Sequence, residues 1–131
     1  MKIENIKFKA KELGTGKWKV GFLQRDMDYN LCILIANKED HSWYWTQIDP
    51  STVCMFTGLK DCEGKELFEN DLIHFIGHKP IGKVIWSEEN YAFMVASENE
   101  ALYWLSDVQE IGKIEIVGNK FDRKEVRNEE V

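Results

Sequence analysis

Apolar and polar side chains alternate with a period of two over most of the chain, which is typical of β-strands with one buried face. Near the N-terminus, Ile6, Phe8 and Ala10 alternate with lysines. The turn residues Gly14-Thr15-Gly16 follow, and the alternation resumes at Trp18. This pattern predicts a two-stranded antiparallel hairpin with one apolar face.

Further short strands are predicted after the hairpin, each bounded by turn residues. They cover residues 31–36, 42–47, 53–57, 71–77, 81–86, 91–96, 101–105 and 113–117. One helical turn or a bend is expected at 65–70, a 3₁₀ turn at 106–109, and a short helix or a frayed end after residue 122. We therefore predict a mainly antiparallel β protein with little helix. Its hairpin and meander (1–52) would pack on a small β-barrel (53–131), or the two would form one compact unit.

The composition of the 131 residues narrows the class of protein. Hydrophobic residues make up 44% and charged residues 31%, which excludes a disordered chain and a membrane protein. The first residues do not form the apolar stretch of a secretory signal. The three cysteines, Cys32, Cys54 and Cys62, are irregularly spaced. We expect a cytoplasmic protein of a bacterial cell with reduced thiols, of which Cys62, in a turn, is the most exposed.

One stretch of the sequence carries a resemblance. It runs Ile48-Asp49-Pro50-Ser51-Thr52-Val53, then Phe56-Thr57-Gly58-Leu59-Lys60-Asp61, then Gly64-Lys65-Glu66-Leu67-Phe68-Glu69-Asn70-Asp71-Leu72-Ile73. This order resembles the YopX family of phage and prophage proteins, and the similarity continues at 82–86 and 114–119. Asn70 stands where the family usually has glycine, but asparagine also tolerates left-handed backbone. The resemblance implies a mainly β fold with a Src-homology-3-like barrel, and it brings no known catalytic residues.

The polar residues of this block have a local explanation in turn chemistry. Thr57 and Gly58 would let a strand turn sharply, and Asp61 and Gly64 would flank a tight turn. Asp71 would accept backbone N–H groups before the next strand. We interpret the signature residues as architecture: Thr57, Gly58, Leu59, Asp61, Gly64, Lys65, Phe68, Glu69 and Asp71.

Elsewhere, the sequence gives little support for a metal site, a phosphate-binding loop or a catalytic motif. Cys54, Cys62, His74 and His78 are spaced C-x₇-C-x₁₁-H-x₃-H, whereas a zinc finger needs two to four residues between its cysteines. The segment 14–17 lacks the spacing of a phosphate-binding loop, and there is no G-x-S-x-G motif. We predict no metal, no cofactor and no enzymatic activity.

Two groups of residues are candidates for binding. If the apolar side chains of the hairpin face the core, a basic face results, made of Lys7, Lys9, Lys11, Lys17 and Lys19. It would protect a sheet edge, or bind an anionic ligand or an acidic protein. Trp43 and Trp45 share one strand face and Tyr44 the other, so these aromatic side chains either pack in the core and its rim or form an exposed patch.

Charge distribution links these candidates to a function. Residues 1–20 hold six lysines and two glutamates, a net of +4, whereas residues 41–131 hold nine basic and seventeen acidic side chains, a net of −8. We therefore expect a phage-type accessory protein that binds an unidentified phage or host protein or assembles with itself. In a dimer or trimer, the lysine face of one subunit would contact the acidic turns of a neighbouring subunit, Glu88/Glu89 or Glu98/Glu100. The alternative is a nucleic-acid-binding barrel using the basic hairpin, which the net charge of −6 disfavours.

Overall fold

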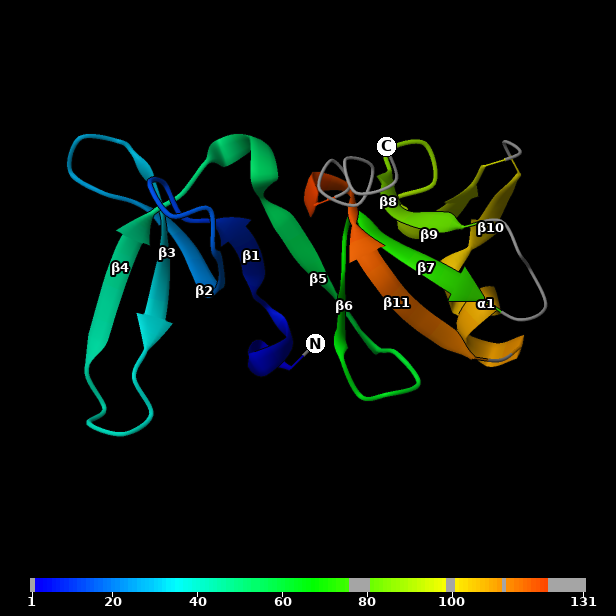
Figure 1. Ribbon diagram of the computed structural model, residues 1–131, viewed down its shortest axis with the longest axis horizontal. Helices are drawn as coiled ribbons and strands as arrows, with labels where there is room; N and C mark the ends of the chain where they lie inside the picture. The colour runs from blue at the N-terminus through cyan, green and yellow to red at the C-terminus, as the bar shows by residue number, and fades with distance from the viewer. Residues whose placement is uncertain (1, 76–80, 99–100, 112, 123–131) are drawn as a thin grey trace, which may run out of the picture. The chain divides into compact units, whose positions relative to one another are not determined.

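The computed structural model describes residues 2–75, 81–98, 101–111 and 113–122. The chain is mainly β, as predicted, with two antiparallel sheets and one short α-helix (Figure 1). It divides into two compact units, Met1–Phe56 (unit 1) and Thr57–Val131 (unit 2). The division falls inside strand β5 (Cys54–Lys60) rather than after residue 52, because one continuous strand runs from the first unit into the second.

Unit 1 contains four strands besides the start of β5. They are β1 (Phe8–Lys11), β2 (Trp18–Arg25), β3 (Leu31–Ala36) and β4 (Trp43–Gln47), with 3₁₀ turns at Ile3–Asn5 and Pro50–Thr52. The strand order of the first sheet is β4-β3-β2-β1-β5-β6, where β6 is Glu66–Phe68. The three connections between β1 and β4 are short, so neighbours in sequence are neighbours in the sheet.

The core of unit 1 lies on one face of this sheet. Ala10, Ile33 and Ile48 are fully or almost fully buried there. Side chains of intermediate burial surround them: Phe8, Leu23, Leu31, Ile35 and Val53. The end of β4 is tied back to the end of β1, since Leu13 N–H donates to the Gln47 carbonyl (3.0 Å) and Asp49 N–H to the Lys11 carbonyl (2.8 Å).

Unit 2 holds the second sheet, with strand order β10-β9-β8-β7-β11. Its elements are β7 (Asp71–Phe75), β8 (Gly82–Ser87), β9 (Ala92–Ser97), β10 (Leu102–Trp104), α1 (Leu105–Ile111), β11 (Ile114–Asn119) and a 3₁₀ turn at Lys120–Asp122. Of the two alternatives for 65–70, the helical turn is absent, and the segment holds β6 followed by a turn. The 3₁₀ turn predicted at 106–109 was wrong, because 105–111 is an α-helix. The predicted end structure after residue 122 lies outside the described residues.

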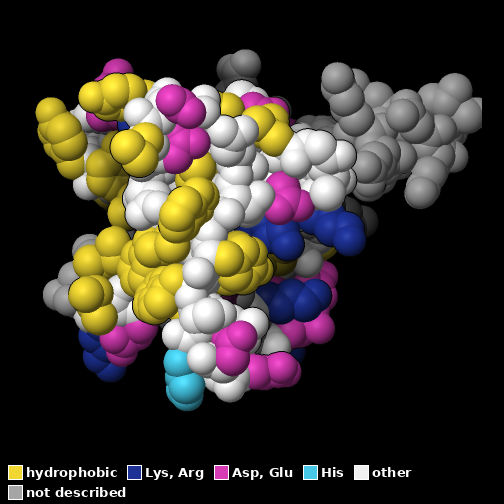
Figure 2. All heavy atoms as spheres, turned by 90° about the vertical axis from the view of Figure 1, so that its left-hand side faces the viewer, with side chains coloured by type: hydrophobic (Ala, Val, Ile, Leu, Met, Phe, Trp, Pro, Cys, Tyr) yellow, Lys and Arg dark blue, Asp and Glu magenta, His cyan; other side chains and the backbone are white. Residues whose placement is uncertain are grey.

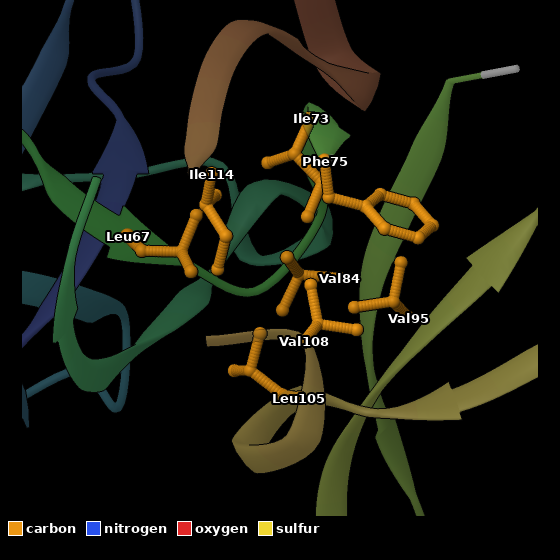
Figure 3. Close-up of a cluster of buried hydrophobic side chains, with 8 residues drawn as sticks. All are labelled: Leu67, Ile73, Phe75, Val84, Val95, Leu105, Val108 and Ile114. Atoms are coloured by element: carbon orange, nitrogen blue, oxygen red, sulfur yellow. The ribbon is translucent and has the colours of Figure 1, made fainter. Parts of the chain in front are cut away.

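The core of unit 2 is built from both sheet and helix. Leu67, Ile73, Phe75, Val84, Val95, Leu105, Val108 and Ile114 form its buried cluster (Figure 3). Leu105 and Val108 are three residues apart on α1, so they lie on one side of the helix and both enter the core. This packing explains why 105–111 is helical: a 3₁₀ turn as short as 106–109 would leave this side of the cluster open.

Among the described helices, none is long and apolar enough to cross a membrane.

Candidate interaction surface

The tight turn after β5 is held by the buried carboxylate of Asp61. Its Oδ1 accepts the backbone N–H groups of Glu63 (2.9 Å) and Lys65 (2.8 Å), and its Oδ2 accepts the N–H of Ile116 in β11 (3.2 Å). Burial raises the pKa of Asp61, but these hydrogen bonds and the charge of Lys65 lower it more, so the net pKa lies below its ordinary value. The ionised carboxylate thus fastens the turn to β11. Gly64 supplies the left-handed residue of the turn, with φ +84°.

A second buried carboxylate, Asp71, organises the start of β7. It accepts the backbone N–H of Phe68 (2.8 Å) and the side-chain amide of Asn119 (2.9 Å). Asn70, just before it, has φ +73°, which is the left-handed conformation expected where the family has glycine. The predicted acceptor role of Asp71 is confirmed.

The other signature residues also belong to turns and strands. Thr57 donates its hydroxyl to the Leu67 carbonyl (2.7 Å) and accepts the N–H of Leu59 (3.2 Å). Gly58 has φ +89°, and Phe68 is buried. Lys65 is exposed in the turn and Glu69 is half-buried. The hydrogen bonds of Thr57 hold β5 to β6, which agrees with the interpretation of this residue as architecture.

The residues of the zinc-like spacing are not gathered into a site. The Cys54 thiol is buried and donates to the Thr52 carbonyl (3.3 Å), while Cys62 and His74 are exposed. His78 lies outside the described residues. Within 2–75, 81–98, 101–111 and 113–122, no three His, Cys, Asp or Glu side chains are grouped to hold a metal ion. The exposure predicted for Cys62, with Cys32 and Cys54 buried, is confirmed.

The five lysines of the hairpin do not share a face, so this part of the sequence analysis was wrong. In the register of β1 with β2, Lys11 lies opposite Trp18, Lys9 opposite Val20, and Ala10 opposite Lys19. Every odd position of β1 therefore pairs with an even position of β2. The cause is the turn, in which Glu12 N–H donates to the Lys17 carbonyl (2.9 Å) and sets this odd offset.

The structure divides those lysines among four environments. Lys9 and Lys11 lie on the face opposite the core, with Nζ atoms 4.6 and 5.4 Å from the ring centre of Trp18. Lys7 contacts the ring of Phe56 in the same way at 4.8 Å. Lys19 lies beside Ala10 on the core face, and Lys17 is exposed in the turn. Three of the lysines therefore flank aromatic rings, and the five do not form one basic surface.

The face opposite the core carries a group of large apolar side chains, here called the aromatic face. It consists of Trp18, Val20, Phe22, Leu34, Trp43 and Trp45. The registers align Phe22, Leu34 and Trp45 in one row across β2, β3 and β4, and the rings of Phe22 and Trp43 are 6.4 Å apart. Figure 2, which views the molecule from the β4 side, shows hydrophobic side chains gathered there with charged groups at the margins.

Exposure distinguishes this face from a core. Trp43 is 56% exposed, Trp45 59%, Phe22 40% and Val20 41%, whereas Leu34 and Trp18 are half-buried. Scattered apolar residues are normal on a surface, but contiguous patches mark interaction sites. The hypothesis of an exposed aromatic patch at Trp43 and Trp45 is consistent with this placement.

Tyr44 lies on the core side of β4 and is nevertheless 45% exposed, because β4 is the outermost strand of its sheet. Val20, Phe22 and Leu34 were missed by sequence reasoning as members of the same surface. Their signal was present in β3, where all six residues of 31–36 are apolar, so that neither face of the strand is polar.

One carboxylate stabilises the junction where β4 meets the end of β1. Glu12 accepts the hydroxyls of Thr46 (2.6 Å) and Thr15 (2.7 Å), and these two hydrogen bonds hold the pKa of Glu12 below its ordinary value. The junction holds only the end of β4, so residues 43–45 lie at the edge of the sheet outside it.

The family model described as YopX protein matches residues 8–125. The chain belongs to the YopX family. A search of curated proteins finds no match. The matched range takes in both units, so the N-terminal strands with the aromatic face are part of the family fold.

Family membership gives the YopX-type chain no function by itself. Of its signature residues, Asp61, Gly64 and Asp71 are accounted for by the turns that they form. The aromatic face, which lies largely before the signature block, is therefore the surface on which a function has to be argued.

Proposed function

We propose that this protein is a non-enzymatic interaction module that binds another protein through the aromatic face of unit 1. The observation that carries the proposal is the exposure of Trp43, Trp45, Phe22 and Val20 on one side of a sheet whose opposite side holds the core. Aromatic side chains are enriched in protein interfaces, where their large apolar area is removed from water. A phage-type accessory role in the bacterial cytoplasm belongs to the same proposal.

The lysines support a partner with an acidic rim. Lys9 and Lys11 stack against Trp18 at the β1 side of the aromatic face, so an acidic residue of the partner would find positive charge beside an apolar surface. Nucleic acid is the weaker candidate, because the whole chain carries a net charge of −6 and would repel a phosphate backbone.

The experiment compares two double variants that each remove two exposed aromatic side chains. Phe22→Thr/Trp45→Thr changes the aromatic face, and Trp86→Thr/Trp104→Thr changes unit 2, where Trp86 is 38% and Trp104 44% exposed. Immobilised wild type and variants are used to capture proteins from extracts of the source cells. Each captured protein is identified, purified and titrated against all three forms.

We expect at least one purified partner whose dissociation constant rises tenfold or more with the first double variant and stays within about twofold with the second. Labelled single-stranded DNA is titrated in parallel at 50 and 500 mM salt. Tight DNA binding with a steep salt dependence that Lys9→Gln/Lys11→Gln removes would replace this proposal with the nucleic-acid alternative. Equal loss of partner binding in both double variants would also overturn it.

A further inference from the structure

Strand β4 ends the first sheet, and in the described part of the chain no strand pairs with the outer edge of Trp43–Trp45, which is therefore called the open edge. It carries Trp43, Tyr44 and Trp45 and no charged residue or proline. Natural proteins usually protect an edge strand with lysine, proline or a bulge, because its free backbone groups invite another strand. An unprotected edge with three exposed aromatic side chains is a surface on which another strand can pair.

The hydrogen-bond pattern shows which backbone groups point outward. Ile48 N–H donates to the Leu31 carbonyl (3.1 Å) and Asn37 N–H to the Ser42 carbonyl (2.7 Å), so even-numbered residues of β4 bond to β3. In an antiparallel ladder the bonding residues alternate, so the N–H and C=O groups of Trp43 and Trp45 point away from β3. Gln47 also points outward, but its carbonyl accepts from Leu13.

The open edge therefore offers only two residues, bounded by the Gln47–Leu13 bond and by the β3–β4 turn. If a second copy pairs with this edge about a two-fold axis through Tyr44, the outward backbone groups of both Trp43 and Trp45 form hydrogen bonds. This axis sets Trp43 opposite Trp45 of a second copy and Trp45 opposite Trp43 of that copy. Each of these two pairs exchanges two backbone hydrogen bonds, and the two Tyr44 residues face each other as a non-hydrogen-bonded pair.

We propose that the partner of this surface is a second copy of the chain, joined edge to edge through antiparallel β4 strands. This deepens the proposed function and rests on it. The axis is perpendicular to the sheet, so both aromatic faces stay on one side and the four tryptophans become neighbours. Because the edge is used once in each copy, the assembly closes as a dimer.

The chemistry of β4 suits a copy of itself. Two identical strands carrying charges would repel each other, but β4 is uncharged along its whole length. Whole aromatic side chains bury roughly 150–250 Å² each, so the exposed parts of Trp43, Tyr44 and Trp45 supply about 240–400 Å² per copy. Two copies give about 480–800 Å² before backbone and flanking atoms are added, compared with about 1,200 Å² at the lower end of stable interfaces. The dimer is accordingly a weak one that needs high concentration.

The first experiment measures mass by sedimentation from about 5 to 500 µM protein. Wild type is expected to pass from monomer to dimer over this range. Trp45→Pro removes an outward N–H that the β3 ladder does not use, and it should raise the dimer dissociation constant at least about tenfold. Trp45→Thr keeps that N–H and should weaken the dimer less. Trp104→Thr, which changes a comparably exposed tryptophan in unit 2, should leave the dimer unchanged.

The second experiment tests the register and does not depend on the proline variant folding. Cys62 is replaced by serine, since it is the exposed thiol among the three cysteines. In this background Tyr44→Cys should form a disulfide-linked dimer under mild oxidation, because the two Cα atoms would lie about 4.5 Å apart. Gln47→Cys should not, since Gln47 lies away from the axis.

The outcomes separate this inference from the function on which it rests. A wild type that stays monomeric at 500 µM and a Tyr44→Cys form that does not cross-link would overturn the self-pairing. The proposed binding of a different protein is tested separately, by the titrations of captured partners. A dimer that 500 mM salt dissociates would also contradict edge pairing. It would point instead to lysines against acidic turns, because exposed charge pairs are screened by salt.

Discussion

The two units use their apolar residues differently. In unit 2, sheet and helix enclose eight buried side chains, and Leu105 and Val108 of α1 close the cluster. In unit 1, the buried core cluster holds only Ala10, Ile33 and Ile48, while Trp43, Trp45 and Phe22 remain exposed on the other face of the same sheet. A sheet with both faces apolar needs a partner on each, and the described residues of unit 1 supply an enclosed core on one.

The family-signature residues and the aromatic face lie in different units. The signature residues lie at the start of unit 2, where the carboxylates of Asp61 and Asp71 accept hydrogen bonds from backbone N–H groups and a side-chain amide. The large exposed side chains cluster in unit 1. The strongest family marker therefore identifies how the chain folds, whereas the surface on which we propose binding lies in the N-terminal unit.

The largest expected effect is in unit 1, at Gly21 of β2. A Cβ atom added there would collide with the backbone carbonyl of Leu34, which cannot rotate away. Gly21→Ala should lower the free energy of unfolding by about 3 kcal/mol or more. At Gly82 of unit 2, an added Cβ would meet side-chain atoms of Val95 (2.5 Å) and Phe75 (2.9 Å), which can shift. Gly82→Ala should therefore cost less in urea unfolding, and the reverse order would contradict this contrast.

A smaller effect is expected at Asp61 of unit 2. Asp61→Asn loses the charge that three backbone N–H groups share, and should cost about 2 kcal/mol at pH 7. Since the pKa of Asp61 is lowered on folding, the unfolded chain binds more protons near its ordinary pKa of 3.8. Its contribution is full above that pH and is lost as pH falls through the lower folded-state pKa.

Unfolding experiments between pH 7 and pH 2 check this dependence. The wild type should lose stability below about pH 4 more steeply than Asp61→Asn. Glu115→Gln, an exposed neighbour on β11, removes the same charge and should track the wild type. If Asp61→Asn and the wild type showed the same acid slope, the turn carboxylate would not be what stabilises β11.

The smallest effect on stability is expected on the aromatic face. Trp45→Thr retains a residue that favours strands and removes a side chain that is 59% exposed, so the cost should be below about 1 kcal/mol. Ile33→Ala, on the buried face of the neighbouring strand, should cost about 2–5 kcal/mol. Thermal unfolding of the two variants measures this contrast. Similar losses would mean that Trp45 belongs to a packed core.

Much of the strand pattern could be read from the sequence, because alternation with a period of two is a local property. The turn chemistry at Asn70 and Asp71 was predictable for the same reason, since each depends on a few adjacent residues. The lysine face was not. Lys9 and Lys19 each obeyed the alternation within their own strand, and only the offset of the turn decided that they lie on opposite faces.

The sequence by itself determined that this is a β-rich chain of the YopX type, because local patterns and a distinctive order of turn residues need no knowledge of distant contacts. Only the tertiary structure decided which face is covered. Residues 31–36 are apolar throughout, so Ile33 and Leu34 look equivalent in sequence, yet Ile33 is fully buried and Leu34 lies in the aromatic face. Burial depends on what packs against a strand from elsewhere in the chain, and here that leaves tryptophans exposed beside an open edge.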